Sequence, residues 1–529
     1  ASVKAVIRII TKKAAGEGFG FNNRFVTRHR RTYGWTTLDQ FNFNYRKGGF
    51  DLSGTLFGGK FRSGNNQQLG MITYLDKLWE QEIDARDGKN TESNVQGVLS
   101  LNYQFNEKHS MGVRYDMDKY FNTISDWRFK TNVYTDKELY ETNVSTMLGE
   151  YPSTKHSLNY YYNGQIGDWN IDFNADGLWN IKEETQHTRE VTNGDTEANV
   201  NTFNKNDGTL YAAKLVVSYP LWQGSLSFGG EYSHTDRSNI YINQEGILAD
   251  DDSRIKEGST GAFIDYSRSF GKVDVQAGIR YENVNFDYYE QGKHIDEQSR
   301  MFNNVFPSLN MNFPIGKAQV QLSYSGGITR PSYDMLRSNT YYSNKYTYQT
   351  GNPFLKPVIN QDINLSASYK WINFSFIYNH IKDDIIQISE PYSDTNPTIS
   401  LLNIINAKSY NNIISSVTLS PTISWWNPQF MAQVYKQWFH IDGKDGELTL
   451  SKPRMTLVWR NSFTLPAGFL FDVDGTYYTK GHIQNMYMGI NSLNVSMGLY
   501  KSFFKDRLSF QLQVTNLLEK DDVDCTIYS

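Results

Sequence analysis

The residue types that could support acid–base or metal chemistry are sparse in this sequence and poorly arranged for it. His380 lies close to Asp383 and Asp384, a spacing that could serve an aspartate–histidine hydrolase. Such chemistry needs groups that converge on one point in space, and the sequence marks no nucleophile beside them. The nine histidines do not pair at the spacing of zinc ligands. We therefore expect no catalytic residue and do not expect an enzyme.

Two acidic runs and one glycine-rich stretch could hold ions or phosphates. Residues 250–252 and 521–524 supply carboxylates of the kind that bind calcium, but they lack the EF-hand spacing and its glycine. Residues 16–20, with the sequence GEGFG, have the glycines of a nucleotide loop without a helix to follow them. Solvated loops and a flexible connection explain these stretches, so we expect no metal and no cofactor.

A cluster of tyrosines beside charged residues is the remaining candidate for a binding site. Aromatic faces stack on sugars or on aromatic metal chelators, and tyrosine hydroxyls add hydrogen bonds. Tyrosines also mark the interface belts of membrane barrels, and the sequence leaves both interpretations open. The residues that would contact a substrate are Tyr341, Tyr342, Tyr346, Tyr348, Arg330, Asp334 and Arg337.

Strict alternation of apolar and polar residues is the dominant pattern of the chain. In the stretch VDVQAGIRYE, Val273 and Ile279 share one face, while Asp274 and Arg280 share the other. A period of two predicts strands with one apolar and one polar face. Aromatic residues make up 15% of the chain, which favours strands, and no run of about 18 apolar residues predicts a membrane helix. The net charge of −4, without a basic block, gives no sign of nucleic-acid binding.

Short turns alternate along the chain with long polar connections. Tight turns and long loops on opposite sides are typical of outer-membrane barrels. Many of the predicted strands are longer than those of soluble proteins and suit a tilted membrane crossing. The long polar stretches are residues 61–94, 121–154, 184–208, 237–258 and 330–360.

The predicted fold is therefore all-β: a transmembrane antiparallel β-barrel of about 22 strands, about 21 of them in this chain, since such barrels usually have even strand numbers. A soluble sandwich or propeller also alternates, but a polar face bearing Glu282 and Lys370 suits a watery lumen better than a packed core. Lipid requires that the sheet close on itself. The leucines expected to face outward are Leu99, Leu101, Leu365 and Leu512.

An RPSY element at residues 330–333 ends one predicted strand, and a GNPFLKP element at residues 351–357 opens the next. These elements resemble those of TonB-dependent receptors, and in particular of their outer-membrane β-barrel subfamily, although Val358 stands where that family usually has an acid. Residues 7–13 resemble the last strand of the family's plug domain. The resemblance implies a plug remnant at residues 1–15 and a barrel at residues 16–529 that lacks its last strand. The motif residues are Arg330, Pro331, Tyr333, Gly351, Asn352, Pro353, Lys356 and Pro357.

The second motif predicts a stiff return of the chain from a long outer loop. Proline fixes φ and pushes the preceding residue toward extended backbone, and Gly351 can adopt a positive φ. We expect this segment to set the register of a strand that starts near Asp362. A structural loop exit and direct contact with substrate are both compatible with the sequence.

The resemblance implies active uptake of a nutrient across a bacterial outer membrane, with siderophore, cobalamin, glycan and peptide as open alternatives. Its implied partners are outer-membrane lipids, the TonB energy-coupling complex through an N-terminal region not in this chain, and a surface lipoprotein; nucleic acid is not among them. A different class of function also fits a barrel. A non-transporting adhesin or scaffold of a surface complex would need neither plug nor TonB box.

Overall fold

A computed structural model describes residues 16–30, 33–64, 66–74, 76–121, 123–443, 446–504, 508–518 and 524–529. The described chain is almost entirely β-structure, with one short 3₁₀ turn, η1 (Pro466–Gly468). Within these residues, no helix has the length and apolar character needed to cross a membrane. The predicted plug remnant at residues 1–15 lies outside the described residues.

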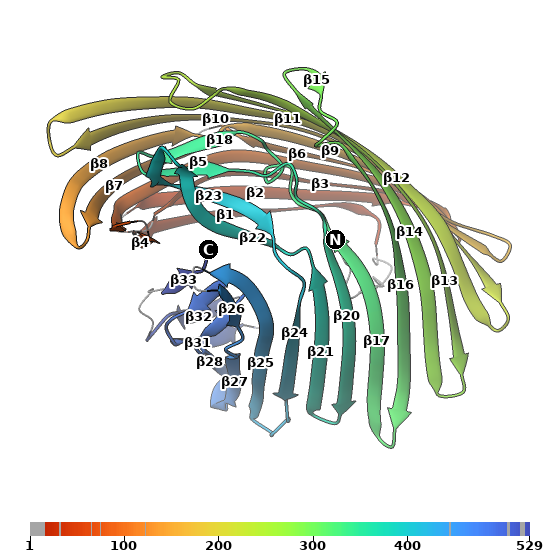
Figure 1. Cartoon of the computed structure of the whole chain (residues 1–529). Coiled ribbons are helices and arrows are strands. Elements are labelled where there is room, and N and C mark those ends of the chain that lie inside the picture. Colours follow the sequence, from red (N-terminus) through yellow and green to blue (C-terminus); the bar gives the residue numbers. More distant parts are fainter. Residues whose placement is uncertain are drawn as a thin grey trace.

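One large curved wall dominates the molecule (Figure 1). Its sheet contains 26 strands, of which five extend the rim and 21 form a continuous meander, each strand antiparallel to the next. The wall strands are β1 (Gly18–Arg30), β2 (Gly34–Lys47), β3 (Phe50–Ser63), β5 (Leu78–Asn106), β6 (His109–Tyr120), β9 (Ser153–Ile166), β10 (Trp169–Thr192), β11 (Thr196–Leu221), β12 (Gly224–Asn243), β13 (Asp251–Phe270), β14 (Val273–Glu290), β16 (Arg300–Ile315), β17 (Ala318–Thr329), β20 (Val358–Tyr369), β21 (Ile372–Lys382), β24 (Tyr410–Leu419), β25 (Trp426–Gly443), β27 (Arg454–Leu465), β28 (Phe469–Tyr478), β31 (Ser492–Phe503) and β32 (Leu508–Val514).

The remaining strands lie in the long connections between wall strands, except β33, which follows the last wall strand. The rim strands are β4 (Gln67–Tyr74), β7 (Ile124–Thr135), β8 (Glu138–Glu150), β15 (Lys293–His294) and β26 (Gly446–Leu450). A separate four-stranded sheet contains β18 (Thr340–Asn344), β19 (Thr347–Thr350), β22 (Ile385–Ser393) and β23 (Asn396–Asn406). A three-stranded sheet contains β29 (Gly481–Ile483), β30 (Met486–Met488) and β33 (Cys525–Ile527).

Alternation along each strand gives the wall an apolar face and a polar face. Cross-strand partners share a face, so the register aligns side chains of one kind in rows. The adjacent positions Gln276, Asn310 and Ser323 form a polar row on the opposite side. One apolar row crosses five strands through Val275, Met311, Leu322, Leu365 and Phe376.

The four leucines expected on the outer face are exposed. Leu99 is 48% exposed, Leu101 39%, Leu365 36% and Leu512 54%. Large apolar side chains at this exposure are incompatible with a packed soluble core, whereas lipid can cover them. The prediction of an all-β membrane barrel over a soluble β-protein is confirmed on this point.

The predicted alternation of tight turns and long connections is also confirmed at the turns. Gly271 and Gly316 have φ values of 64° and 61° in two of the short turns, a conformation that glycine adopts without strain. Several long stretches predicted as polar loops are instead strands. Residues 184–208, for example, continue β10 and β11 into a hairpin around Asn193. Their inner face carries polar residues such as Asn204 and Asn206, so apolar alternation does not mark them as strands.

Candidate functional site

A cap covers part of the wall's concave side, and two long connections build it (Figure 1). The segment between β17 and β20 supplies β18 and β19, and the segment between β21 and β24 supplies β22 and β23. These pairs join because β19 runs parallel to β23, with Thr347 opposite Ser400. The backbone N–H of Ser400 also donates to the carbonyl of Tyr346 at 2.8 Å. The cap lies at the end of the wall opposite the tight turns.

Two glutamates, one on the wall strand β10 and one on the rim strand β8, hold the tip of the cap. The Tyr342 hydroxyl donates to Glu190 Oε2 at 2.8 Å, and the Lys345 backbone N–H donates to Glu190 Oε1 at 3.2 Å. Lys345 Nζ reaches both oxygens of Glu141, at 2.9 and 3.2 Å, and the Tyr346 hydroxyl donates to the same carboxylate. Burial raises the pKa of Glu190, and these hydrogen bonds oppose that shift. The ion pair between Lys345 and Glu141 is stronger than a neutral hydrogen bond, so this tip is firmly attached.

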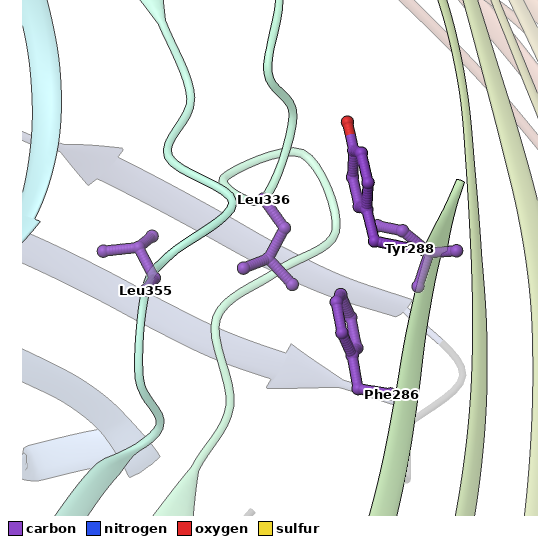
Figure 2. Packing of buried hydrophobic residues seen from close by; sticks show 5 residues of the cluster. Phe286, Tyr288, Leu336 and Leu355 are labelled. Atoms are coloured by element: carbon purple, nitrogen blue, oxygen red, sulfur yellow. The ribbon is translucent and has the colours of Figure 1, made fainter. Parts of the chain in front are cut away.

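An apolar cluster anchors the base of the cap (Figure 2). Leu336 and Leu355 come from the two ends of the segment between β17 and β20, and Phe286 and Tyr288 project from β14. Leu355 is 1% exposed and Tyr288 is fully buried. Burying large apolar side chains stabilises by about 1.5–3 kcal/mol each, so this packing fixes the loop base against the wall.

The GNPFLKP motif lies in this anchored base. Gly351 was expected to adopt a positive φ, and it is absent from the residues that do. Glycine is needed here because there is no room for a side chain. A Cβ at this position would lie 2.6 Å from the carbonyl oxygen of Arg337 and 2.8 Å from that of Met335. The Asn352 side chain donates to the carbonyl of Ile404 at 2.9 Å, linking both cap segments. Strand β20 begins at Val358, directly after Pro357, instead of near Asp362.

The RPSY motif is placed apart from the tyrosine-rich tip. Arg330 pairs with Glu282 of β14, whose side chain is 6% exposed. Arg280 Nη2 lies 2.9 Å from the other oxygen of Glu282 and also pairs with Glu231. Arg330 therefore ends its strand in a charge cluster on the concave face of the wall.

A cavity of about 540 Å³ lies between the cap and the inner face of the wall. Four predicted binding residues line it: Asp334, Arg337, Tyr341 and Tyr342. The Arg337 guanidinium lies 3.9 Å from the centroid of the Tyr341 ring. Burial raises the pKa of Glu184, another lining residue, while Lys182 and Arg337 oppose that shift. The lining of the cavity thus combines charged, amide and apolar side chains.

The other predicted tyrosines are buried in packing contacts instead of lining the cavity. Tyr346 is 4% exposed and packs with Trp79 and Val133. Tyr348 is 7% exposed and meets the Tyr342 ring at 5.7 Å between centroids. The structure therefore brings four of the seven predicted residues to one cavity and places Arg330, Tyr346 and Tyr348 elsewhere.

The weaker candidates for chemistry are engaged in structural bonds. His380 Nδ1 contacts Asn411 Oδ1 at 2.8 Å, whereas Asp384 accepts from the hydroxyl of Tyr410 at 2.7 Å. Asp251 accepts from Ser253 at 2.9 Å. Among the described residues, no group of three or more His, Cys, Asp or Glu side chains is arranged to hold a metal ion. Residues 521–523 of the second acidic run lie outside the described residues.

The sequence interpretation missed Glu141 and Glu190, which hold the cap, and Asn204, which lines the cavity. Glu190 and Tyr342 are separated by 152 positions, so no local pattern links them. The one available signal was the position of Glu141 and Glu190 in long polar stretches that alternate with tight turns.

Comparison with known proteins places the chain in a family. Residues 165–528 match the outer membrane protein beta-barrel family, and no curated protein matches the sequence significantly. The siderophore receptor PirA from Pseudomonas aeruginosa is 13% identical, with a TM-score of 0.58 over 97% of this chain and 79% of that one. The FrpB iron transporter from Neisseria meningitidis is also 13% identical, with a TM-score of 0.56 over 97% of this chain and 79% of that one.

A third similar structure is the outer membrane transporter YddB from Escherichia coli, at 12% identity and a TM-score of 0.55 over 92% of this chain and 72% of that one. At these identities the structural likeness concerns the fold, and it agrees with the meander of long antiparallel strands. The family match covers more than half of the sequence. This chain therefore belongs to the outer membrane protein beta-barrel family, and its location is the bacterial outer membrane.

Proposed function

We propose that this chain forms the wall and outer loops of a TonB-dependent importer that takes up a nutrient across the outer membrane. The observation that supports this most is the cap, which the chain's own loops build over a cavity on the concave side of the wall. A passive pore needs an open water path. A cap fixed by buried carboxylates suits a receptor that holds its ligand before passage.

Energy coupling in this proposal comes from a plug domain and a TonB-binding segment of the protein. Siderophore receptors and an iron transporter are among the structures similar to this chain, which supports uptake over adhesion. A surface lipoprotein that covers the cap is a further proposed partner. The chain's own part in this scheme is to bind the nutrient at the outer face and to line its route.

The test is uptake by cells that carry the full-length gene, compared with cells that lack it, with and without an uncoupler of the proton gradient. A panel of labelled ferric siderophores, cobalamin, oligosaccharides and peptides covers the substrate classes. Uptake of one class that stops with the uncoupler supports the importer. If a surface-exposed, folded barrel takes up none of them, an adhesin or scaffold becomes the better interpretation.

A further inference from the structure

The cavity beneath the cap has two chemically different halves. Its polar half lies on β10 and β11, and its apolar half lies on β4, β5, β7 and β8. The polar half is formed by Lys182, Glu184, Gln186, Asn204 and Asn206. The apolar half is formed by Leu69, Met71, Ile83, Phe129 and Met147. A ligand that fills this space has a polar part and an aliphatic part.

The charges that line the cavity are balanced. Lys182 and Arg337 supply two cations, and Glu184 and Asp334 supply two carboxylates. Asp334 also pairs with Arg237, which lies outside the cavity. Because Asp334 is already paired, Glu184 is the lining carboxylate that would repel an anionic metal chelate, at a cost in electrostatic energy. A ligand that carries both an ammonium and a carboxylate group finds Glu184 for the first and Lys182 for the second.

The three tyrosine rings of the cavity are not available as a stacking platform, which leaves Phe129 as its one other aromatic lining residue among the described residues. The Arg337 guanidinium covers the Tyr341 ring at 3.9 Å. Tyr241 is 1% exposed and meets Tyr341 edge-on, and Tyr342 is 7% exposed. Ring stacking on a sugar requires an open aromatic face, and the apolar half of the cavity, which contains Phe129, offers no partners for sugar hydroxyls. These features disfavour an oligosaccharide.

One buried amide points to a ligand with hydrogen-bond donors. Asn204 is 5% exposed and lines the cavity, and its Oδ1 has no hydrogen-bond partner in the part of the chain that the structure describes. An unmatched buried acceptor costs about 1–3 kcal/mol, and a turn of the Asn204 side chain toward a ligand donor in the cavity would recover it. Gln186 and Asn206 add further carboxamides, which both donate and accept, as the backbone of a peptide does.

We propose that this cavity binds a short peptide. The peptide backbone and its charged ends lie on the polar half, and an aliphatic side chain lies among Leu69, Met71, Ile83 and Met147. The volume of about 540 Å³ falls within the range of small-ligand sites and admits a few residues, not a folded protein. This assignment rests on the proposed import function, for which it names the substrate class.

Binding is tested with the purified full-length protein in detergent by isothermal titration calorimetry. The ligands are the tetrapeptide Ala-Leu-Leu-Ala, its N-acetylated form, maltotetraose and a ferric tris-catecholate. We expect the free peptide to bind and the other two classes to bind at least about tenfold more weakly, a difference of about 1.4 kcal/mol. Tighter binding of maltotetraose or the ferric complex would overturn the assignment.

Two variants separate the site from the fold. Asn204→Leu removes the unmatched acceptor and should weaken binding of the free peptide at least about tenfold. Its matched control is Lys205→Gln, on the next residue of β11 and the opposite face, where Lys205 Nζ lies 3.3 Å from Glu183. The control should bind as the unaltered protein does. Equal binding by Asn204→Leu, with both variants folded by circular dichroism, would contradict the site.

A second comparison tests recognition of the peptide's amino end. The unaltered protein should prefer the free over the acetylated peptide, and Glu184→Gln should bring the ratio of the two affinities toward one. An unchanged ratio would show that Glu184 does not bind the ammonium group. Peptide binding without gradient-dependent uptake of any compound would disprove the importer and leave the site standing. Gradient-dependent uptake of another class, without peptide binding, would disprove the site and leave the importer standing.

Discussion

Single carboxylates hold the cap to the wall, and Glu190 is one of the most buried. It is 2% exposed and accepts from both Tyr342 and the backbone of Lys345. Because burial raises the pKa of Glu190, the folded protein keeps its proton at a pH at which the unfolded chain has lost it. Glu190 therefore contributes its full share to the stability of the folded protein when the pH is below 4.5, the ordinary pKa of a glutamate. This contribution is lost as the pH rises through the pKa of Glu190 in the folded protein.

Glu190→Gln should reduce this pH dependence, because glutamine still accepts from Tyr342 and carries no charge. The measurement is deuterium exchange of the backbone amides in β18 and β19 between pH 4.5 and pH 7, corrected for intrinsic rates. We expect protection to fall with rising pH in the unaltered protein and to change less in the variant. The control is Glu197→Gln, since Arg189 lowers the pKa of that exposed carboxyl. Identical profiles for Glu190→Gln and the unaltered protein would refute the argument.

Gly351 occupies a position where the backbone of the loop folds back on itself. In Gly351→Ala, the new Cβ would meet the carbonyl oxygens of Arg337 and Met335 at 2.6 and 2.8 Å. Overpacking of this kind costs about 1–3 kcal/mol, so the thermal midpoint should fall. Gly70→Ala is the control, because a Cβ at that strand position meets nothing within 4 Å. Equal midpoints for the two variants would show that the loop base yields without cost.

At the scale of strands, the outward face of β20 can be tested with one pair of adjacent residues. Leu365 is 36% exposed and belongs to the apolar row, whereas Ser366 lies on the other face, opposite Gln321 and Ser375. Leu365→Arg places a cation in lipid near the middle of the crossing, at a cost of about 2–4 kcal/mol. Ser366→Arg leaves the charge in the watery lumen. The free energy of unfolding in lipid vesicles should fall for the first variant only, and equal losses would reverse the face assignment.

The strands show where sequence reasoning succeeds and where it stops. Leu99 and Leu365 were placed correctly, because alternation reports directly which face meets lipid. The last part of β10, from residue 184 onward, was predicted as a loop. Both of its faces carry polar residues, so the apolar alternation that marks a strand is missing there. The cap is harder still. Tyr342 and Glu190 meet across 152 positions, a contact set by the tertiary fold and not by any local preference.

At the scale of the whole molecule, the two ends of the meander pose a geometric question. The 21 wall strands are each antiparallel to the next, so β1 and β32 run in the same direction. No pairing between these two strands occurs within the described residues. Direct closure would require one parallel pair in an otherwise antiparallel wall.

We propose that one further strand, antiparallel to both, closes the wall as a 22nd strand, since every backbone group in lipid must be paired. Phe21 on β1 and Phe510 on β32 are 68% and 53% exposed, as expected of outer-face positions beside such a strand. Cryo-electron microscopy of the full-length protein in lipid nanodiscs tests this directly. The expected map shows a strand hydrogen-bonded to β1 on one side and to β32 on the other. Direct parallel pairing of β1 with β32 would refute it, because the odd-numbered wall would then be complete.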